Sequence, residues 1–187
     1  VTEAAHAAFG FPRDTSVAVF NMDARNRVED ILGSLPAGDD AARFDYVFGD
    51  SINDFSVPYH LTTREFAGNV HAILKPGGVY MLNLIDVLDS GRFMAAAVGA
   101  CGEAFDHVRV FSTLGVPDKR DTFVVVASDA PLDLAGIEEA IREANSFAGR
   151  LLEAAEVDAL LARTGRVVLR DDYAPVENLL APVANTR

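Results

Sequence analysis

Short apolar runs alternate along the chain with longer segments in which apolar residues recur every three or four positions. The short runs are typical of buried strands, and the longer segments are typical of helices that bury one face. The predicted strands cover residues 16–20, 46–49, 79–85, 107–112, 122–127 and 166–169. The predicted helices cover residues 2–9, 24–35, 62–74, 91–105, 134–145 and 153–163. This order predicts an α/β fold, followed by an ordered tail at 171–187.

Two late strands, 107–112 and 122–127, are joined by a connection that contains Gly115 and Pro117 and shows no helical pattern. Such a pair is expected to be antiparallel, whereas the helical connections between earlier strands favour right-handed parallel units. The predicted fold is therefore a three-layer α/β sheet with a C-terminal antiparallel hairpin. Because no linker or internal repeat interrupts the pattern, we expect a single domain over 1–187.

Composition narrows the class of protein. A length of 187 residues suits one domain with a substantial core, and a hydrophobic fraction of 50% argues against a disordered chain. The formal net charge of -12 disfavours a nucleic-acid partner, because phosphate backbones are bound by basic surfaces. This charge is compatible with a cationic substrate such as an amine, although acidity also serves solubility alone.

Cys101 is the only cysteine, so the chain has no internal disulfide, and its small neighbours predict a buried structural thiol in a cytoplasmic protein. No apolar run approaches the roughly 20 residues of a membrane helix, and Glu3 and His6 interrupt the apolar core that a signal peptide would need. The four histidines are scattered, which argues against a metal site. The first residue is Val1, so we expect that other residues preceded it.

The most informative stretch runs from Phe44 to Asp50, where an apolar strand ends on a carboxylate. Ligands of open α/β sheets bind at the carboxyl ends of strands. Asp50 could accept a proton from an amine nucleophile or hold it electrostatically, or it could cap a turn with Ser51. Asp54, in the loop that follows, could bind a cationic amine or be a solvated loop residue.

Other candidate residues flank the predicted helices. Asp23 follows the strand at 16–20, where its carboxylate could accept hydrogen bonds from an adenine amino group or another amine, or cap the helix that begins at Ala24. Tyr59 could line a substrate pocket or pack at a helix entry. The Lys-Pro-Gly-Gly stretch at 75–78 predicts a sharp turn from a helix into a strand, and not a phosphate loop, because a strand follows it.

Together these motifs resemble the S-adenosylmethionine-dependent methyltransferase fold, a Rossmann-like sheet, and more narrowly the spermidine synthase family of aminopropyltransferases. The resemblance covers most of the chain. It rests on Asp23-Ala24-Arg25 after a strand, Phe44-Asp45-Tyr46-Val47 before Asp50, Pro58 followed by 61–66, the segment 74–78 before a strand, and the late segment 171–176.

The resemblance implies a role for each matched residue. Asp23 would bind the adenine amino group of the donor, with Met22 and Ala24 beside it, and Asp50 would deprotonate or orient the attacking amine. Ser51 would bind the donor together with Asp50. The donor would be decarboxylated S-adenosylmethionine and the acceptor putrescine or a similar polyamine, without a metal.

Asp54 and Tyr59 are the candidates for binding the acceptor. Two alternatives remain: an S-adenosylmethionine-dependent methyltransferase acting on a small molecule, and a non-catalytic module that retains the fold.

The chain departs from the family pattern in two ways. The family usually has an aspartate three residues after the catalytic one, whereas this chain has Asn53 there and Asp54 next, so the acceptor can differ from putrescine. The strand with a Gly-x-Gly loop and the acidic strand after it are not found before Ser16. We therefore expect a sheet that lacks its first two strands, which in the family lie between the strands at 16–20 and 46–49.

A gap inside a sheet would leave buried strand edges unpaired, which is costly. The sequence accordingly predicts a rearranged sheet or a homo-oligomer that exchanges strands, together with weak or absent donor binding.

Overall fold

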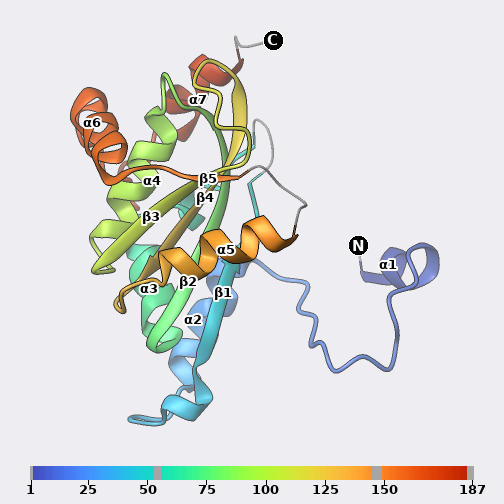
Figure 1. Cartoon of the computed structure of the whole chain (residues 1–187). Coiled ribbons are helices and arrows are strands. Elements are labelled where there is room, and N and C mark those ends of the chain that lie inside the picture. Colours follow the sequence, from blue (N-terminus) through green and yellow to red (C-terminus); the bar gives the residue numbers. More distant parts are fainter. Residues whose placement is uncertain (1, 53–55, 145–148, 185–187) are drawn as a thin grey trace.

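The computed structural model describes residues 2–52, 56–144 and 149–184, and these residues form a five-stranded sheet in the order β1-β2-β4-β3-β5 (Figure 1). The strands are β1 (Phe44–Gly49), β2 (Leu74–Val87), β3 (His107–Ser112), β4 (Arg120–Ser128) and β5 (Arg150–Leu151). The α-helices are α1 (Thr2–Ala8), α2 (Ala24–Ser34), α3 (Arg64–Ile73), α4 (Arg92–Gly102), α5 (Leu134–Ala144), α6 (Ala154–Thr164) and α7 (Val176–Ala184). Two 3-10 turns, η1 (Asp40–Ala42) and η2 (Tyr59–Leu61), precede β1 and α3.

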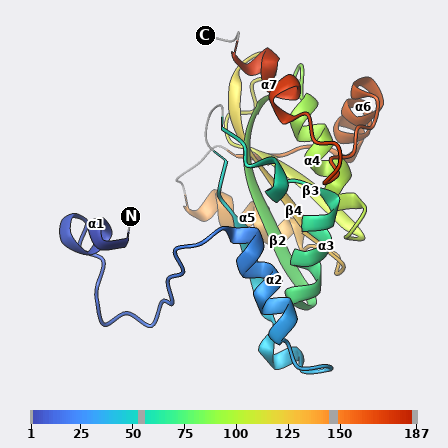
Figure 2. The same cartoon turned by 180° about the vertical axis from the view of Figure 1, so that it is seen from behind.

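The pairing of the strands follows their connections. β1 and β2 are parallel because α3 returns the chain between them, whereas β2 pairs antiparallel with β4, and β4 antiparallel with β3. The predicted C-terminal hairpin is thereby confirmed. Helices α2, α3, α4 and α7 lie on one face of the sheet, and α5 crosses the other (Figures 1 and 2).

The core lies between the sheet and the helices α3 and α4 that pack on it. Alternate residues of β2 are buried, as expected of a strand with one face on the core, and Leu84 has no exposed surface. Phe93 of α4 and Phe123 of β4 are equally buried, and Cys101 is enclosed with them. The predicted buried thiol is thereby confirmed, and burial raises the pKa of the Cys101 thiol to about 12.

The Lys-Pro-Gly-Gly stretch makes the predicted sharp entry into β2. Gly77 has a φ of 74°, in the left-handed region that favours glycine. At Gly78 a Cβ atom would lie 3.0 Å from the carbonyl oxygen of Lys75, so a side chain there would crowd the turn. The pairing of β1 with β2 passes from Phe44–Leu74 directly to Tyr46–Val79. The residues of β2 between these two pairs therefore bulge out of the ladder.

Two predicted strands towards the ends of the chain are absent. Residues 16–20 are extended but belong to no strand, and residues 166–169 form none either, with an isolated bridge between Arg170 and Tyr173 close by. The tail contains α7, which includes Pro182 and buries Val176, Leu180 and Val183. Burial of this apolar face stabilises the helix although Pro182 lies within it.

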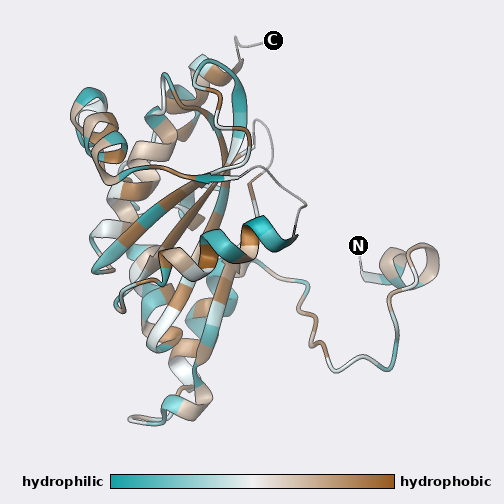
Figure 3. Ribbon diagram, in the orientation of Figure 1, coloured by the Kyte–Doolittle hydropathy of each residue, from teal (hydrophilic) through white to brown (hydrophobic). Residues whose placement is uncertain are grey.

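Within the described residues the sheet has no internal gap, which agrees with the first of the two predicted alternatives, a rearranged sheet. It runs without interruption from β1 to β5, and β1 is its edge. The segment expected beyond the gap instead leaves the sheet as part of an N-terminal arm, residues 2–22, whose helix α1 buries no residue. The arm points away from the sheet and carries an exposed hydrophobic stretch (Figures 1 and 3).

Candidate functional site

A pocket of about 420 Å³ lies at the carboxyl end of β1, between this strand, α2 and α3. Four of the predicted site residues line it: Met22, Ala24, Asp50 and Ser51. They come from the two segments that follow residues 16–20 and β1, which the fold brings together although they are distant in sequence. The volume falls within the range of small-molecule sites.

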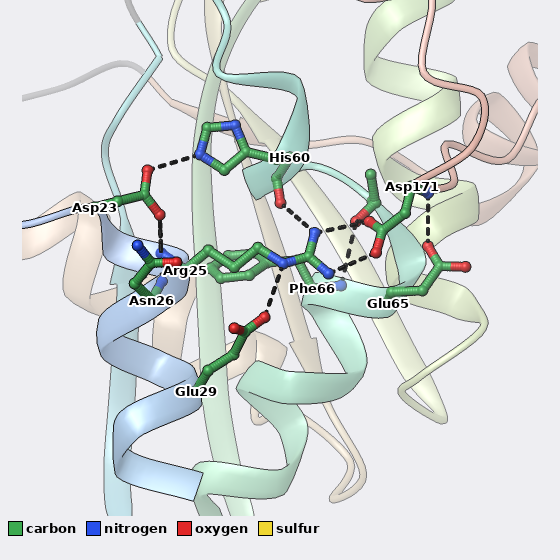
Figure 4. Close-up of polar contacts among 9 residues, drawn as sticks. Asp23, Arg25, Asn26, Glu29, His60, Glu65, Phe66 and Asp171 are labelled. Atoms are coloured by element: carbon green, nitrogen blue, oxygen red, sulfur yellow. Dashed lines mark hydrogen bonds and ion pairs between the residues drawn. The ribbon is translucent and has the colours of Figure 1, made fainter. Parts of the chain in front are cut away.

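Asp23 caps α2, as one of the two interpretations of its sequence position predicted. Its Oδ1 atom accepts hydrogen bonds from the amides of Arg25 (2.9 Å) and Asn26 (3.2 Å), and its Oδ2 atom lies 2.8 Å from Nε2 of His60 (Figure 4). The hydrogen bond to His60, followed by the amide of Asn26, lowers the pKa of Asp23. The carboxylate is therefore ionised and fixed beside the pocket, with both oxygen atoms already in contact with protein groups.

Arg25 ties the same region to the end of the chain. Its guanidinium donates to both carboxylate oxygens of Asp171, at 2.7 and 2.5 Å, and to the carbonyl oxygen of His60 at 3.1 Å (Figure 4). Its Nε atom bonds Glu29 one turn further along α2. The pKa of Asp171 is lowered, chiefly by Arg25 and also by the hydroxyl of Thr63. This fork-to-carboxylate geometry holds three separate segments in one arrangement.

The start of α3 is attached to the same C-terminal segment. Thr63 caps α3 and donates its hydroxyl to Asp171 at 2.7 Å, while Glu65 accepts the amide of Asp171 at 3.1 Å. The amide of Arg64 donates to the carbonyl oxygen of Leu169 at 2.9 Å. The segment at 169–173 thus buttresses η2 and α3, which form one wall of the pocket. Motif spacing alone did not reveal this support.

Asp50 is the acidic group of the pocket. It follows Gly49 at the end of β1, is exposed, and accepts a hydrogen bond from Nδ2 of Asn83 at 2.8 Å. Its other oxygen has no hydrogen-bond partner within the described ranges of the chain. Sequence reasoning missed Asn83, although a polar residue inside the apolar run of β2 was a signal for it. One oxygen of Asp50 is therefore oriented by the protein while the other stays open to a ligand.

Tyr80 reaches the floor of the pocket from β2. A Cβ atom on Gly49 would lie 3.0 Å from the Tyr80 hydroxyl, so glycine at this position makes room for the phenol. Tyr80 is 2% exposed, and burial raises its pKa, which keeps the phenol neutral. Phe66 of α3 also lines this apolar part of the pocket.

The remaining predicted residues have other positions. Tyr59, in η2, lies edge-on to the ring of His60 with 5.7 Å between ring centroids, and it is not among the residues that line the pocket. This contact corresponds to the packing alternative. Asp54 lies outside the described residues.

Nowhere in 2–52, 56–144 or 149–184 do three or more His, Cys, Asp or Glu side chains gather in a position to hold a metal ion. Over the same ranges, every helix is too short or too polar to cross a membrane.

The chain has an open α/β sheet with a pocket at a strand's carboxyl end, and its likeness to solved structures shows its class of fold, the methyltransferase fold. Within that class, a similar solved structure is a probable spermidine synthase from Corynebacterium glutamicum ATCC 13032. The two share 21% identity with a TM-score of 0.73, over 93% of this chain and 61% of the other. No family model matches the sequence, and no curated protein does.

Two further structures share the fold at lower similarity. Human methyltransferase-like protein 13, solved in complex with SAH, is 20% identical with a TM-score of 0.55, over 96% of this chain and 73% of the other. Spermidine synthase from Thermotoga maritima is 19% identical with a TM-score of 0.54, over 87% and 56%. The chain therefore spans between about half and three fifths of the length of these spermidine synthases.

Proposed function

We propose that the chain is a spermidine synthase-like transferase that moves an aminopropyl group from decarboxylated S-adenosylmethionine to a polyamine acceptor. The observation that carries the proposal is the gathering of Met22, Ala24, Asp50 and Ser51 in one pocket, next to the ionised Asp23. A spermidine synthase in complex with the transition-state analogue AdoDATO has the same fold at 20% identity. The single cysteine, Cys101, agrees with a reducing cytoplasmic location.

The proposed transfer reaction needs the protein mainly to position the amine and the donor. The amine nitrogen attacks the carbon attached to the donor's sulfonium, the carbon–sulfur bond breaks, and a neutral thioether leaves. The amine must be held in line and must lose a proton. In this proposal Asp50, whose one oxygen accepts a hydrogen bond from Asn83, orients the amine and accepts that proton.

Donor selection distinguishes the second candidate, methyl transfer to a small molecule. It is favoured by the human methyltransferase-like protein, which was solved with SAH. The two reactions differ only in the alkyl group that leaves the sulfonium. The assay therefore offers each donor separately with a panel of amines and measures methylthioadenosine or S-adenosylhomocysteine by chromatography.

We expect the 187-residue chain to bind its donor more weakly than micromolar, so the assay uses millimolar donor. The reason is that the described residues include no Gly-x-Gly loop for the donor's ribose and amino-acid end. Isothermal titration calorimetry that gives a micromolar dissociation constant would contradict this expectation.

Asp50→Asn is the decisive variant, and we expect it to lower kcat/KM by about 100-fold. Asp45→Asn is the matched control, because Asp45 lies in β1 but pairs with Lys75 at 2.8 Å outside the pocket. Equal activity in the two variants would reject Asp50 as the acidic group. Absence of product with both donors would favour the non-catalytic module.

A further inference from the structure

Tyr80 is a buried residue in the middle of the sheet whose side chain is held in one place. It is 2% exposed, and its ring stacks on that of Phe105 with 6.2 Å between ring centroids. At this point β2 pairs with Val47 of β1 on one side and with Ala127 of β4 on the other. The position of Tyr80 is therefore set by strands on both sides and not by a free sheet edge.

The hydroxyl group of Tyr80 opens onto the pocket at the end of β1. Across the described residues, every side-chain nitrogen or oxygen that is cut off from solvent has a hydrogen-bond partner. The Tyr80 hydroxyl makes no hydrogen bond within the same ranges, so it must keep some access to solvent, and Tyr80 lines this pocket. A Cβ atom on Gly49 would lie 3.0 Å from the hydroxyl oxygen, so glycine at this position leaves the hydroxyl uncovered.

Folding alone gives no reason for a hydroxyl at this position. A buried hydroxyl without a hydrogen-bond partner is unfavourable, and a phenylalanine of the same shape would avoid that cost. The core of the chain uses phenylalanine at other fully buried positions, such as Phe93 and Phe123. The Tyr80 hydroxyl is thus a hydrogen-bond donor that is available to a molecule bound in the pocket.

The surroundings of the hydroxyl limit the kind of group that it can meet. The pocket walls include the apolar side chains of Val28, Val47 and Phe66, whereas its acidic group is Asp50 at the end of β1. A neutral donor among apolar walls favours an uncharged acceptor, because a charge there would lose its water without gaining a counter-ion. Protonated amines and sulfonium groups do not accept hydrogen bonds. The adenine ring is the flat, uncharged part of the proposed ligands that carries acceptor nitrogens.

We infer that the Tyr80 hydroxyl donates a hydrogen bond to a ring nitrogen of the donor's adenine, and that it thereby selects a purine nucleoside in this pocket. The inference rests on the proposed function only in taking the ligand to be a sulfonium nucleoside, and it holds equally for aminopropyl and for methyl transfer. Tyr80 is then a binding residue, so loss of its hydroxyl changes the affinity for the nucleoside and leaves the fold intact.

Adenosine binding to the 187-residue chain tests the inference, measured by ligand-observed NMR at millimolar nucleoside. Tyr80→Phe removes only the hydroxyl, and we expect it to raise the dissociation constant of adenosine about tenfold. Tyr173→Phe is the control, because Tyr173 is 62% exposed and is not among the residues that line the pocket. A wild-type chain that binds no adenosine at about 10 mM, or one whose affinity equals that of Tyr80→Phe, would overturn the inference.

Deaza analogues of adenosine, in which one ring nitrogen at a time is replaced by C–H, identify the acceptor atom. The analogue that lacks the contacted nitrogen should bind the wild type and Tyr80→Phe equally, because neither complex then contains the hydrogen bond. If Tyr80→Phe weakened the binding of every analogue as much as that of adenosine, the hydroxyl would meet another group, and the contact with adenine would be rejected.

Urea denaturation without nucleoside separates a binding role from a structural one. The midpoint of Tyr80→Phe should equal or exceed that of the wild type, because the hydroxyl has no partner in the folded chain. A clearly lower midpoint would mean that the hydroxyl is bonded within the protein, which contradicts the inference. Gly49→Ala is a second variant in case Tyr80→Phe does not fold: its added Cβ atom crowds the hydroxyl and should also weaken adenosine binding.

The outcomes also distinguish this inference from the proposed function. If no donor gives a product but Tyr80→Phe binds adenosine about tenfold more weakly, the transfer reaction is rejected and the role of Tyr80 stands. If a product forms but Tyr80→Phe keeps the affinity of the wild type, the transfer reaction stands and the role of Tyr80 is rejected.

Discussion

The guanidinium of Arg25 and the carboxylate of Asp171 form a bidentate ion pair across 146 positions of sequence. It joins the first turn of α2 to the segment before α7, and the carbonyl oxygen of His60 shares the same guanidinium. Asp23, two residues before Arg25, is thereby tied to the wall of the pocket.

Replacing Arg25 with glutamine should lower the free energy of unfolding by about 1–2 kcal/mol, because a partly buried bidentate pair is lost and Asp171 keeps an unpaired charge. Urea denaturation measures the change. Arg13→Gln is the control: the Arg13–Glu3 pair is well exposed, so its loss should have little effect. Similar losses in both variants would mean that the Arg25 pair has no special structural role.

The Arg25–Asp171 pair should also make stability depend on pH. Arg25 lowers the pKa of Asp171 below its unfolded value, so its stabilising contribution is present above the unfolded pKa and is lost as pH falls through the folded one. The stability difference between the wild type and Asp171→Asn should therefore shrink in acid, below about pH 4. Urea titrations at several pH values check this, and a difference that grows in acid would contradict it.

Asp86 should give the opposite pH dependence. It is fully buried and accepts the amides of Val87 (2.7 Å) and Met94 (2.9 Å), yet burial raises its pKa to about 6. The folded protein therefore holds a proton that the unfolded chain releases near pH 4, and stability falls as pH rises from about 4 to about 6, by roughly 3 kcal/mol at most. Asp86→Asn should remove this slope.

Asp121, the cross-strand partner of Asp86, is the natural contrast. Burial raises its pKa, but hydrogen bonds from Ser112, Thr113 and nearby amides outweigh that effect and lower it. Asp121→Asn should therefore destabilise the protein most at neutral pH and least in acid. For Asp86, the contradicting outcome is a variant Asp86→Asn whose unfolding free energy falls between pH 4 and 6 as steeply as that of the wild type. The buried Asp86 would then not be the cause of that fall.

Asp23 has a structural role and a proposed binding role that substitutions can separate. Asp23→Ala removes the cap of α2 and should cost about 1 kcal/mol of unfolding free energy, whereas Asp23→Asn keeps a capping oxygen and should cost less. If Asp23 also binds the adenine amino group of the donor, Asp23→Asn should still raise the donor KM. A donor KM unchanged in Asp23→Asn would leave Asp23 as a cap alone.

Local patterns along the sequence were enough to locate most of the elements. The 3.6-residue period placed α2 to α6 within a few residues, and the apolar runs placed β1 to β4. The cap at Asp23, as one of two interpretations, and the turn at Gly77 could also be located, because their hydrogen bonds and backbone angles involve only near neighbours. The gathering of the 22–24 and 50–51 segments was expected from the resemblance to the spermidine synthases.

Tertiary contacts decided what local patterns could not. Residues 16–20 have the composition of a strand, but a strand exists only where a partner satisfies its backbone groups, and here none lies beside it among the described residues. α7 is a helix despite Pro182 because the core buries its apolar face. Arg25 pairs with Asp171, and Asp50 with Asn83, because distant segments of the chain pack together. No spacing in the sequence indicates these pairs. The sequence by itself thus determined the elements and the acidic strand end, while the packing of distant segments determined which groups support that acid and left β1 as the exposed edge.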